Sequence, residues 1–463
     1  MRTRATCLIL ALLGACSEDP GGDVGDAGSD RASDVGRADR LADRSDGADG
    51  PRDRADVDPP PTGAIADPTL LPIASGQEPN HGAYAALDVP ALSAGSAYLD
   101  PTTGVTVYRV TDARTPIANE RGQPDYSDGG PFISLPWERD GDTHYTLYLA
   151  VRPVPSFHYL VDFDYTAGTF ENWREAPVQG NEITFSFSNN PDTAQIAYYL
   201  EDRTLHRYDT GAMATADTGN FPHTFAIGRE GDWLSVDMND RWFVCQEEFD
   251  GGTVAVWNSE TNVEHHGATG EPHMIRDGSF VMGAENRASD HEELTGHVVS
   301  NTALLNLATG ELTRPDQPES HPAGAANGFF MAVDPNQGGG NQLYRFEAAT
   351  GFETHLGGRG DIIGSSGHFA GQWVVNNEPG LDLWMLFSGW GGSSIVIDAI
   401  AFVPFNATSG NVRLLAHHYS SVGEDYYAQP HATLSPDGKL VLFGSNMNDS
   451  GRIDAFLAIV PAR

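Results

Sequence analysis

Five histidines recur at nearly even intervals along the chain. They are His223, His273, His321, His368 and His431, separated by 50, 48, 47 and 63 residues. Each stands beside a short apolar run that leads through a turn into a second apolar run. Imidazoles bind metals and accept protons near neutral pH, so a fold that gathers these five could hold a divalent ion or supply a general base. The alternative is that each histidine forms a hydrogen bond to the backbone of a neighbouring repeat and has only a structural role.

The repeat itself predicts the fold. Short β-rich runs separated by turn residues fill the chain from about residue 100, with almost no helical periodicity. A period in this range, with four short strands per unit, is typical of β-propeller blades. Two earlier hairpins, at residues 131–150 and 183–200, lack the histidine and bring the units to seven. We therefore expect an all-β fold for residues 66–463, a seven-bladed β-propeller of four-stranded blades.

Smaller features complete this prediction. The apolar run at residues 105–110 has no hairpin partner, and we expect it to close the ring as the outer strand of the last blade, because closure removes exposed edges. Ala-Thr-Gly at residues 308–310 and 349–351 is expected to join third and fourth strands. Residues 66–100 are expected to pack across a face or the rim, and residues 390–405 are interpreted as an insertion in the sixth unit.

In a propeller the innermost strand of each blade lines a central channel, and its first residue lies near one mouth. All five histidines are predicted to begin innermost strands and to face one pocket. On this interpretation His223 and His273 contact a substrate, while Trp390, in the insertion, stacks on a sugar ring. The pairs His265-His266 and His417-His418 fall where outer strands or connections are expected, and both pairs are predicted to be exposed.

The first 65 residues predict export and a tether. Residues 1–15 combine two Arg with an apolar stretch, as in a secretory signal peptide, and end in Leu-Gly-Ala before Cys16, as in a bacterial lipobox. This predicts lipidation of the Cys16 thiol and, because Ser17 follows, sorting to the outer membrane. Residues 16–65 are rich in Asp, Arg, Gly, Ala and Pro, which predicts a disordered acidic tether. Cys245 is then the single remaining thiol, so no internal disulfide is expected.

The charge balance limits the partners. The chain holds 27 Lys and Arg against 64 Asp and Glu, a formal net charge of −37. After the +2 of residues 1–15 and the −7 of the tether are set aside, −32 remains on the predicted propeller. Nucleic acid is therefore excluded as a partner, and a membrane is contacted only through the lipid anchor. A polyanionic substrate is disfavoured unless a cation intervenes.

Several local sequences carry a resemblance to known propellers. Val105-Thr-Val-Tyr-Arg-Val-Thr, the hairpin Ser435-Pro-Asp-Gly and the Ala-Thr-Gly turns resemble the TolB-like periplasmic propellers. More narrowly, Ser320-His321-Pro322, Gly367-His368 and Gln429-Pro430-His431 are similar to oligogalacturonate lyase, a seven-bladed polysaccharide lyase that acts on pectin fragments. The resemblance covers about residues 105–463 at the level of the repeat pattern.

The lyase resemblance implies β-elimination at a uronate. It places a divalent ion (Mn, Ca or Zn) on His368, His431 and Gln429, where the ion would neutralise the uronate carboxylate. It makes His321 the base that removes the C5 proton, with Arg287 as the candidate catalytic arginine. Gln429 departs from the family pattern, because it stands where the last-blade motif has a second histidine.

The sequence thus leaves three functions open. The first is a cell-envelope lipoprotein that cleaves uronate-containing oligosaccharides with the help of a metal. The second is a non-catalytic propeller that binds a glycan, a peptide or an envelope protein at its face. The third is another propeller enzyme with a channel metal, such as a hydrolase. All three place the chain at the bacterial envelope, on the periplasmic or the surface face of the outer membrane.

Overall fold

The structure is a computed structural model. It describes residues 64–119, 121–123, 132–152, 157–178, 184–247, 253–268, 270–274, 278–286, 300–313, 320–325, 329–334, 342–347, 352–363, 366–370, 384–390, 396, 398–421 and 428–463. Contacts divide the chain into Met1–Arg52 and Asp53–Arg463, and every described residue belongs to the second unit. The described residues are mostly β-sheet. Their helical elements are short: η1 (Pro68–Leu70), α1 (His81–Ala86), η2 (Val89–Ala91), η4 (Pro191–Thr193) and α3 (Arg359–Ile362).

Five antiparallel sheets follow one another along the described part of the chain. The first is β8 (Phe185–Phe187), β9 (Ile196–Glu201), β10 (Thr204–Asp209), β11 (Ala214–Thr215) and β12 (His223–Thr224). The second is β13 (Gly231–Val236), β14 (Trp242–Glu247), β15 (Thr253–Asn258) and β16 (Glu264–Ala268). The third is β17 (Gly270–Met274), β18 (Phe280–Asn286), β19 (Ser300–Asn306) and β20 (Leu312–Thr313). The fourth is β21 (Ser320–Ala325), β22 (Phe329–Asp334), β23 (Gln342–Glu347) and β24 (Phe352–Gly358). The fifth is β25 (Ser366–Ala370), β26 (Trp384–Trp390), β27 (Ala399–Pro404) and β28 (Arg413–His417).

A sixth sheet has ten strands and combines both ends of the described chain. Its early strands are β1 (Ala97–Leu99), β2 (Thr106–Arg109), β3 (Arg121–Gln123), β4 (Trp137–Arg139), β5 (Asp142–Arg152), β6 (Phe157–Asp164) and β7 (Thr169–Glu175). Its late strands are β29 (Thr433–Leu434), β30 (Leu440–Ser445) and β31 (Asp454–Ile459).

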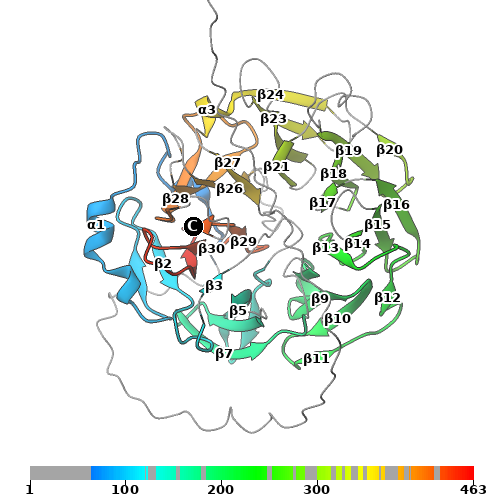
Figure 1. The fold of residues 1–463 in the computed structure, drawn as a ribbon, viewed down its shortest axis with the longest axis horizontal. Helices are drawn as coiled ribbons and strands as arrows, with labels where there is room; N and C mark the ends of the chain where they lie inside the picture. Colours follow the sequence, from blue (N-terminus) through cyan, green and yellow to red (C-terminus); the bar gives the residue numbers. More distant parts are fainter. Residues whose placement is uncertain are drawn as a thin grey trace, which may run out of the picture. The chain divides into compact units, whose positions relative to one another are not determined.

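The sheets are arranged around a common centre, with β13, β17, β21 and β29 near it and β16, β20 and β24 at the periphery (Figure 1). Successive sheets touch through their inner strands, since β13 contacts β8 and β9, β17 contacts β13, and β21 contacts both β17 and β25. This arrangement is that of a β-propeller. Because the five consecutive sheets are antiparallel meanders with the same radial order, their innermost strands begin at the same end. We call this end, with residues 429–431 before β29, the inner rim.

The turn after each third strand explains why the repeat is visible in the sequence. Four third strands end in an Asp or Asn whose side chain accepts the backbone N–H three residues later: Asp164, Asp209, Asn258 and Asn306. The residue four positions after each has a positive φ: Gly168, Met213, Asn262 and Gly310. Asx side chains favour such turns, and Gly and Asn tolerate the left-handed conformation. The prediction for residues 308–310 is therefore confirmed, whereas residues 349–351 lie outside the described residues.

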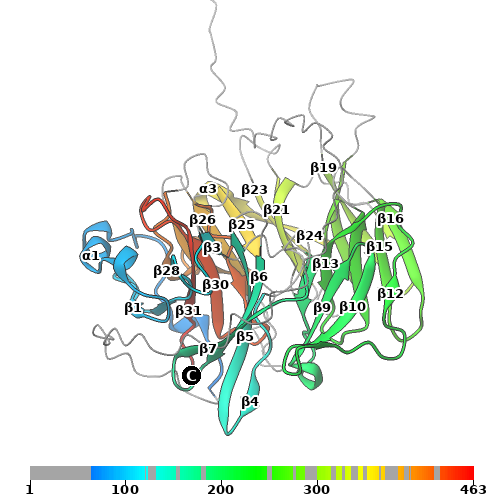
Figure 2. The same ribbon diagram turned by 60° about the horizontal axis from the view of Figure 1, so that its bottom comes forward.

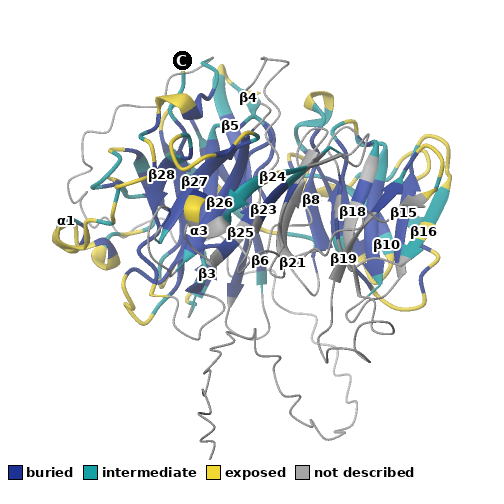
Figure 3. Ribbon diagram, turned by 90° about the horizontal axis from the view of Figure 1, so that it is seen from above, coloured by how far each residue is buried: buried dark blue, intermediate teal, exposed yellow. Residues whose placement is uncertain are grey.

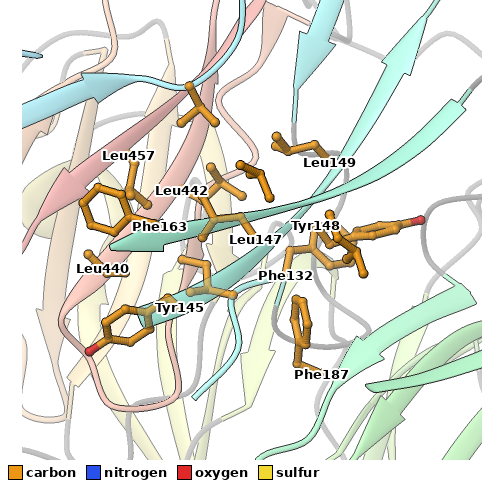
Figure 4. Close-up of a cluster of buried hydrophobic side chains, with 14 of the residues drawn as sticks. Phe132, Tyr145, Leu147, Tyr148, Leu149, Phe163, Phe187, Leu440, Leu442 and Leu457 are labelled. Carbon is orange, nitrogen blue, oxygen red and sulfur yellow. The ribbon is translucent and has the colours of Figure 1, made fainter. Parts of the chain in front are cut away.

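Buried apolar layers join neighbouring sheets. Leu440, Leu442 and Leu457 of the late strands pack with Tyr145 and Leu147 of β5 (Figure 4). The other face of β5 packs on the first of the five sheets, where the rings of Tyr148 and Phe185 stack with centroids 4.2 Å apart. Because β5 is buried on both faces, six of the seven residues at positions 145–151 are apolar, instead of alternating with polar ones. Figure 3 shows the same burial along the described strands and exposed residues at α1 and the connections.

The two ends of the described chain are joined by strand pairing. β2 pairs antiparallel with β31, so the expected pairing of residues 105–110 with the C-terminal strand is confirmed. β3 pairs with both β31 and β5, and the Tyr145 hydroxyl donates to Asp437 Oδ2 at 2.6 Å. Arg109 of β2 forms a buried ion pair with Asp454 of β31. Hydrogen bonds and charge therefore hold the first and last strands together.

Residues 64–100 pack on the outer strands of the fifth and sixth sheets, as Figures 1 and 2 show for α1 and β1. The Ala74 N–H donates to the Val412 carbonyl, and the Leu414 N–H donates to the Pro72 carbonyl. Tyr84 of α1 stacks on Tyr419 with ring centroids 3.7 Å apart. This agrees with the expectation that the segment covers part of the rim.

The strands of the sixth unit differ from the prediction. Residues 399–404 form β27 and Trp390 ends β26, so residues 390–405 include one regular strand of the fifth sheet and the last residue of another, and the interpretation as an insertion is wrong for these residues. The strand that pairs with β25 is β26, through residues 386–390. The surplus residues of this unit are 371–383, which lie outside the described residues.

Candidate functional site

Four of the five histidines lie on innermost strands or directly before one. His273 is in β17, His321 is the second residue of β21, His368 is in β25, and His431 precedes β29 by two residues. These are the innermost strands of consecutive sheets (Figure 1). The backbone thus places the four positions around the common centre: His321 and His431 are at the inner rim, His368 is in the middle of its strand, and His273 is the next-to-last residue of its strand. The side chains of His273, His321 and His368 lie outside the described residues, as do Arg287 and Cys16.

His223 is elsewhere, and the prediction that it begins an innermost strand is wrong. It lies on β12 at the outer part of its sheet, where its backbone pairs with Leu205 of β10. Its ring stacks on Trp257 with centroids 4.1 Å apart, and its Nε2 bonds Glu264 Oε2 at 2.8 Å. Burial lowers the pKa of His223, and the bond to Glu264 opposes this shift. The chain returns to the inner rim only at β13, eight residues later.

His431 and Gln429 are the metal-ligand candidates whose side chains the structure describes. His431 is 3% exposed and has φ 39°, a left-handed value that is unusual outside Gly, Asn and Asp. Gln429 is half-buried. The Pro430 carbonyl between them accepts the Gly444 N–H at 2.7 Å, which fixes the segment to β30. Non-glycine residues held in this conformation cluster at functional sites.

His418 is a buried histidine beside this segment. Its Nε2 is 2.8 Å from the Gly389 carbonyl of β26, and its Nδ1 accepts the Ser420 N–H at 3.0 Å. A ring that donates through one nitrogen and accepts at the other is the neutral tautomer. Burial lowers the pKa of His418 to about 4, although nearby Asp398 acts in the opposite direction. This ring therefore positions the inner rim and stays uncharged at neutral pH.

The expectation that His417 and His418 are exposed is wrong, because both are buried. His417 Nε2 is 3.2 Å from the Gln77 carbonyl, and its backbone N–H donates to Asp100 Oδ2 at 3.0 Å. Both partners come from residues 64–100, which cover the end of β28. In the other pair, His266 is 40% exposed, as expected, and His265 is half-buried against Trp242.

Trp390 lies at the inner rim, at the end of β26, where its backbone is paired with Ser366. It is half-buried. The same register places Gly367 opposite Gly389 and His368 opposite Ser388. Since the Gly389 carbonyl receives the His418 ring, that ring lies one pairing away from the backbone of His368. The strands thus bring positions 368, 390, 418 and 429–431 to one side of the inner rim.

The other side of the inner rim has a feature that sequence reasoning missed. Three consecutive innermost strands carry a bulge near their beginning: β13 between Asp232 and Ser235, β17 between Gly270 and His273, and β21 between Ser320 and Gly324. Trp233 in the first bulge has φ 58°. β-Bulges redirect side chains and are over-represented beside active sites. The sequence shows Trp233 only as part of an apolar run, which does not distinguish a bulge from a regular strand.

The described side chains alone do not form a metal centre. Among them, no group of three or more His, Cys, Asp or Glu is arranged to hold a metal ion. Two of the three predicted metal ligands, His431 and Gln429, offer an imidazole and an amide, and the third, His368, lies on β25. No helix of the described chain has the length and apolarity needed to cross a membrane.

Comparisons with known proteins give distant structural neighbours. No protein-family model matches the sequence, and no curated protein matches it. Hydrazine synthase of Kuenenia stuttgartiensis is 11% identical, with a TM-score of 0.43, covering 72% of this chain and 96% of that chain. The β-propeller domain of the trilobed protease from Pyrococcus furiosus is 9% identical, with a TM-score of 0.42, covering 71% and 93%. TolB from Acinetobacter baumannii is 12% identical, with a TM-score of 0.35, covering 69% and 81%. At these values the neighbours do not indicate what this chain binds, and the description of the fold rests on its strand pairing.

Proposed function

We propose that residues 66–463 form a seven-bladed propeller of four-stranded blades. The ten-stranded sheet can be divided into two meanders, one of β5, β6 and β7 and one of β29, β30, β31 and β2, which β3 connects. The bridge between Ile133 and Leu147 supplies the innermost position of the first meander. These two blades and the five other sheets make seven.

We further propose that this chain is an exported lipoprotein of the outer membrane whose propeller binds oligosaccharides at the inner rim. The lipobox-like sequence before Cys16 supports the anchor. The observation that carries the binding proposal is the placement of His273, His321, His368 and His431 on four consecutive innermost strands. Imidazoles gathered there, with the half-buried Trp233 and Trp390 at the same rim, would offer hydrogen bonds and aromatic faces to a sugar.

A second candidate, β-elimination, is favoured by one specific observation. His321 lies inside the bulge of β21, and His368 and His431 are on the next two innermost strands. In this proposal His321 removes the C5 proton of a uronate. The electron pair of the C–H bond forms the C4–C5 double bond, the bond from C4 to its oxygen breaks, and the leaving alcohol takes up a proton. His368, His431 and Gln429 would hold a divalent ion, which supplies positive charge to the uronate carboxylate when bound.

The test compares an inner-rim histidine with an outer one. Oligosaccharides of neutral and uronate sugars are titrated calorimetrically into the wild type, His321→Ala and His223→Ala. We expect a loss of binding or turnover in His321→Ala and wild-type behaviour in His223→Ala, since His223 is bonded to Glu264 at the periphery. Equal effects of both substitutions would contradict the proposal.

The same samples separate binding from catalysis. Metal content after purification and the ultraviolet absorbance of unsaturated products decide between the candidates. Bound metal together with a new absorbance supports elimination, whereas calorimetric binding without either supports a binding protein. Replacing Cys16 by Ser tests the anchor, because the chain should lose its lipid in mass spectrometry and leave the membrane fraction. Lipid retained on the Cys16→Ser chain would contradict the proposed anchor.

A further inference from the structure

Trp233 has an unusual position at the inner rim. It is the third residue of β13, the innermost strand of its sheet, and it is half-buried. The residue after it, Leu234, is completely buried in the apolar layer shared with the preceding sheet. We infer that Trp233 is the stacking platform for a neutral pyranose ring at the inner rim, an inference that rests on the proposed oligosaccharide binding.

The bulge sets Trp233 apart from the regular strand. Asp232 pairs with Gln246, while the next paired residue, Ser235, is opposite Val244. Trp233 and Leu234 therefore share the space opposite one residue of β14. In a regular strand these two side chains would point to opposite faces, and an extra residue changes the direction of the side chain at the bulge. The adjacent innermost strands β17 and β21 carry bulges at the same end.

The backbone of Trp233 is held in a conformation that bulky residues avoid. Its φ of 58° lies in the left-handed region, where a large side chain is a clear outlier. Two contacts hold it there: its N–H donates to Asp232 Oδ1 at 3.0 Å, and the Gly231 N–H donates to the Asp202 carbonyl at 2.7 Å. Gly231 cannot carry a side chain, because a Cβ would lie 2.5 Å from Cys245 Sγ. Strain of this kind persists where surrounding structure imposes it, and it concentrates at ligand sites.

The chemistry favours an uncharged sugar. The indole of Trp233 has a broad apolar face, which suits the C–H face of a pyranose. The formal charge of −32 on residues 66–463 repels an anionic ligand. Asp232, beside Trp233, adds a carboxylate on the same strand. A neutral pyranose needs no opposite charge and therefore fits this side of the rim better than a uronate.

Two substitutions separate stacking from backbone strain. Trp233→Asn suits the left-handed backbone but removes the aromatic face, whereas Trp233→Phe keeps an aromatic face. Trp137→Asn is the matched control, because Trp137 is also half-buried but lies on β4, whose hairpin with β5 extends away from the other strands (Figure 2). Calorimetric titration with neutral gluco-, xylo- and manno-oligosaccharides should show Kd raised about tenfold in Trp233→Asn and much less in Trp233→Phe. Trp137→Asn should bind like the wild type.

The outcomes distinguish this inference from the proposed function. If the wild type binds and Trp233→Asn binds equally well, the stacking role is refuted while oligosaccharide binding stands. If the wild type binds no oligosaccharide, charged or neutral, the proposed function fails and the stacking role fails with it. Iodide quenching provides a readout that needs no ligand: the quenchable fluorescence should fall in Trp233→Phe relative to the wild type. An unchanged quenchable fraction would show that Trp233 is not accessible and would also overturn the inference.

Discussion

Replacing His418 by Gln should remove a defined part of the pH dependence of stability. The folded chain holds this imidazole neutral between the Gly389 carbonyl and the Ser420 N–H, and burial lowers its pKa to about 4. In the unfolded chain the imidazole has its ordinary pKa of about 6.5. Glutamine can donate to the same carbonyl and accept from the same N–H, but it does not titrate.

The magnitude follows from these two pKa values. Between about pH 6.5 and 4 the unfolded chain binds a proton that the folded chain does not, so acid favours unfolding in this window. The stability that neutral His418 contributes is fully present above the unfolded value and decreases as the pH falls. The difference corresponds to about 3 kcal/mol lost by about pH 4. Burial lowers the pKa of neighbouring His417 as well, so the free energy of unfolding of the variant still decreases as the pH falls.

The assay is urea unfolding of the wild type and His418→Gln at several pH values. Subtracting one stability curve from the other cancels every group that the two proteins share. We expect the wild type to lose about 3 kcal/mol relative to the variant between about pH 7 and 4. Parallel curves would refute the description of His418 as a neutral, buried ring. A wild type that becomes more stable than the variant as the pH falls would show that the predicted pH dependence has the wrong sign.

Three further predictions concern buried polar groups. Burial raises the pKa of Asp237 to about 6, so the stability contributed by its neutral form is present at low pH and lost as the pH rises. Near pH 8, urea unfolding should show Asp237→Asn to be more stable than the wild type by up to about 3 kcal/mol. Near pH 4 the two proteins should be equally stable. Asp454→Asn leaves the Arg109 charge buried without its counter-ion and should cost about 3–5 kcal/mol in denaturant unfolding, where a loss below about 1 kcal/mol would contradict the ion pair. Tyr145→Phe removes the 2.6 Å bond to Asp437 and should lower stability by about 1–2 kcal/mol, while an unchanged unfolding midpoint would count against that contact.

The sequence predicted the repeat because its turns have a local chemical cause. Asn306 and Gly310 supply the side-chain acceptor and the left-handed residue of an Asx turn, while Asp140 and Gly141 supply the two positive-φ residues of the β4–β5 hairpin turn. Such signals require only neighbours along the chain. The pairing of β2 with β31 could also be inferred, because an unpartnered apolar run in a ring needs a sheet edge.

The errors arise where the position of a residue depends on distant segments. His223 follows the same local pattern as the other histidines, but residues 216–230 run along the outer part of a sheet before the chain returns to β13. His417 and His418 have a sequence that suggests exposure, but both are buried: residues 64–100 cover His417, and His418 bonds the Gly389 carbonyl of β26. Neither fact follows from periodicity, since burial is decided by what packs against a strand.

The most direct test of the account is the distance between inner-rim positions. Pairs of nitroxide labels are introduced with His321→Cys and His431→Cys, or with His223→Cys and His431→Cys, and measured by pulsed electron paramagnetic resonance. Cys245 can remain, because it is completely buried and burial raises the pKa of its thiol far above the usual range. The account predicts a shorter distance for the first pair, because positions 321 and 431 surround one centre while position 223 is peripheral. An equal or longer distance between positions 321 and 431 would contradict the shared site.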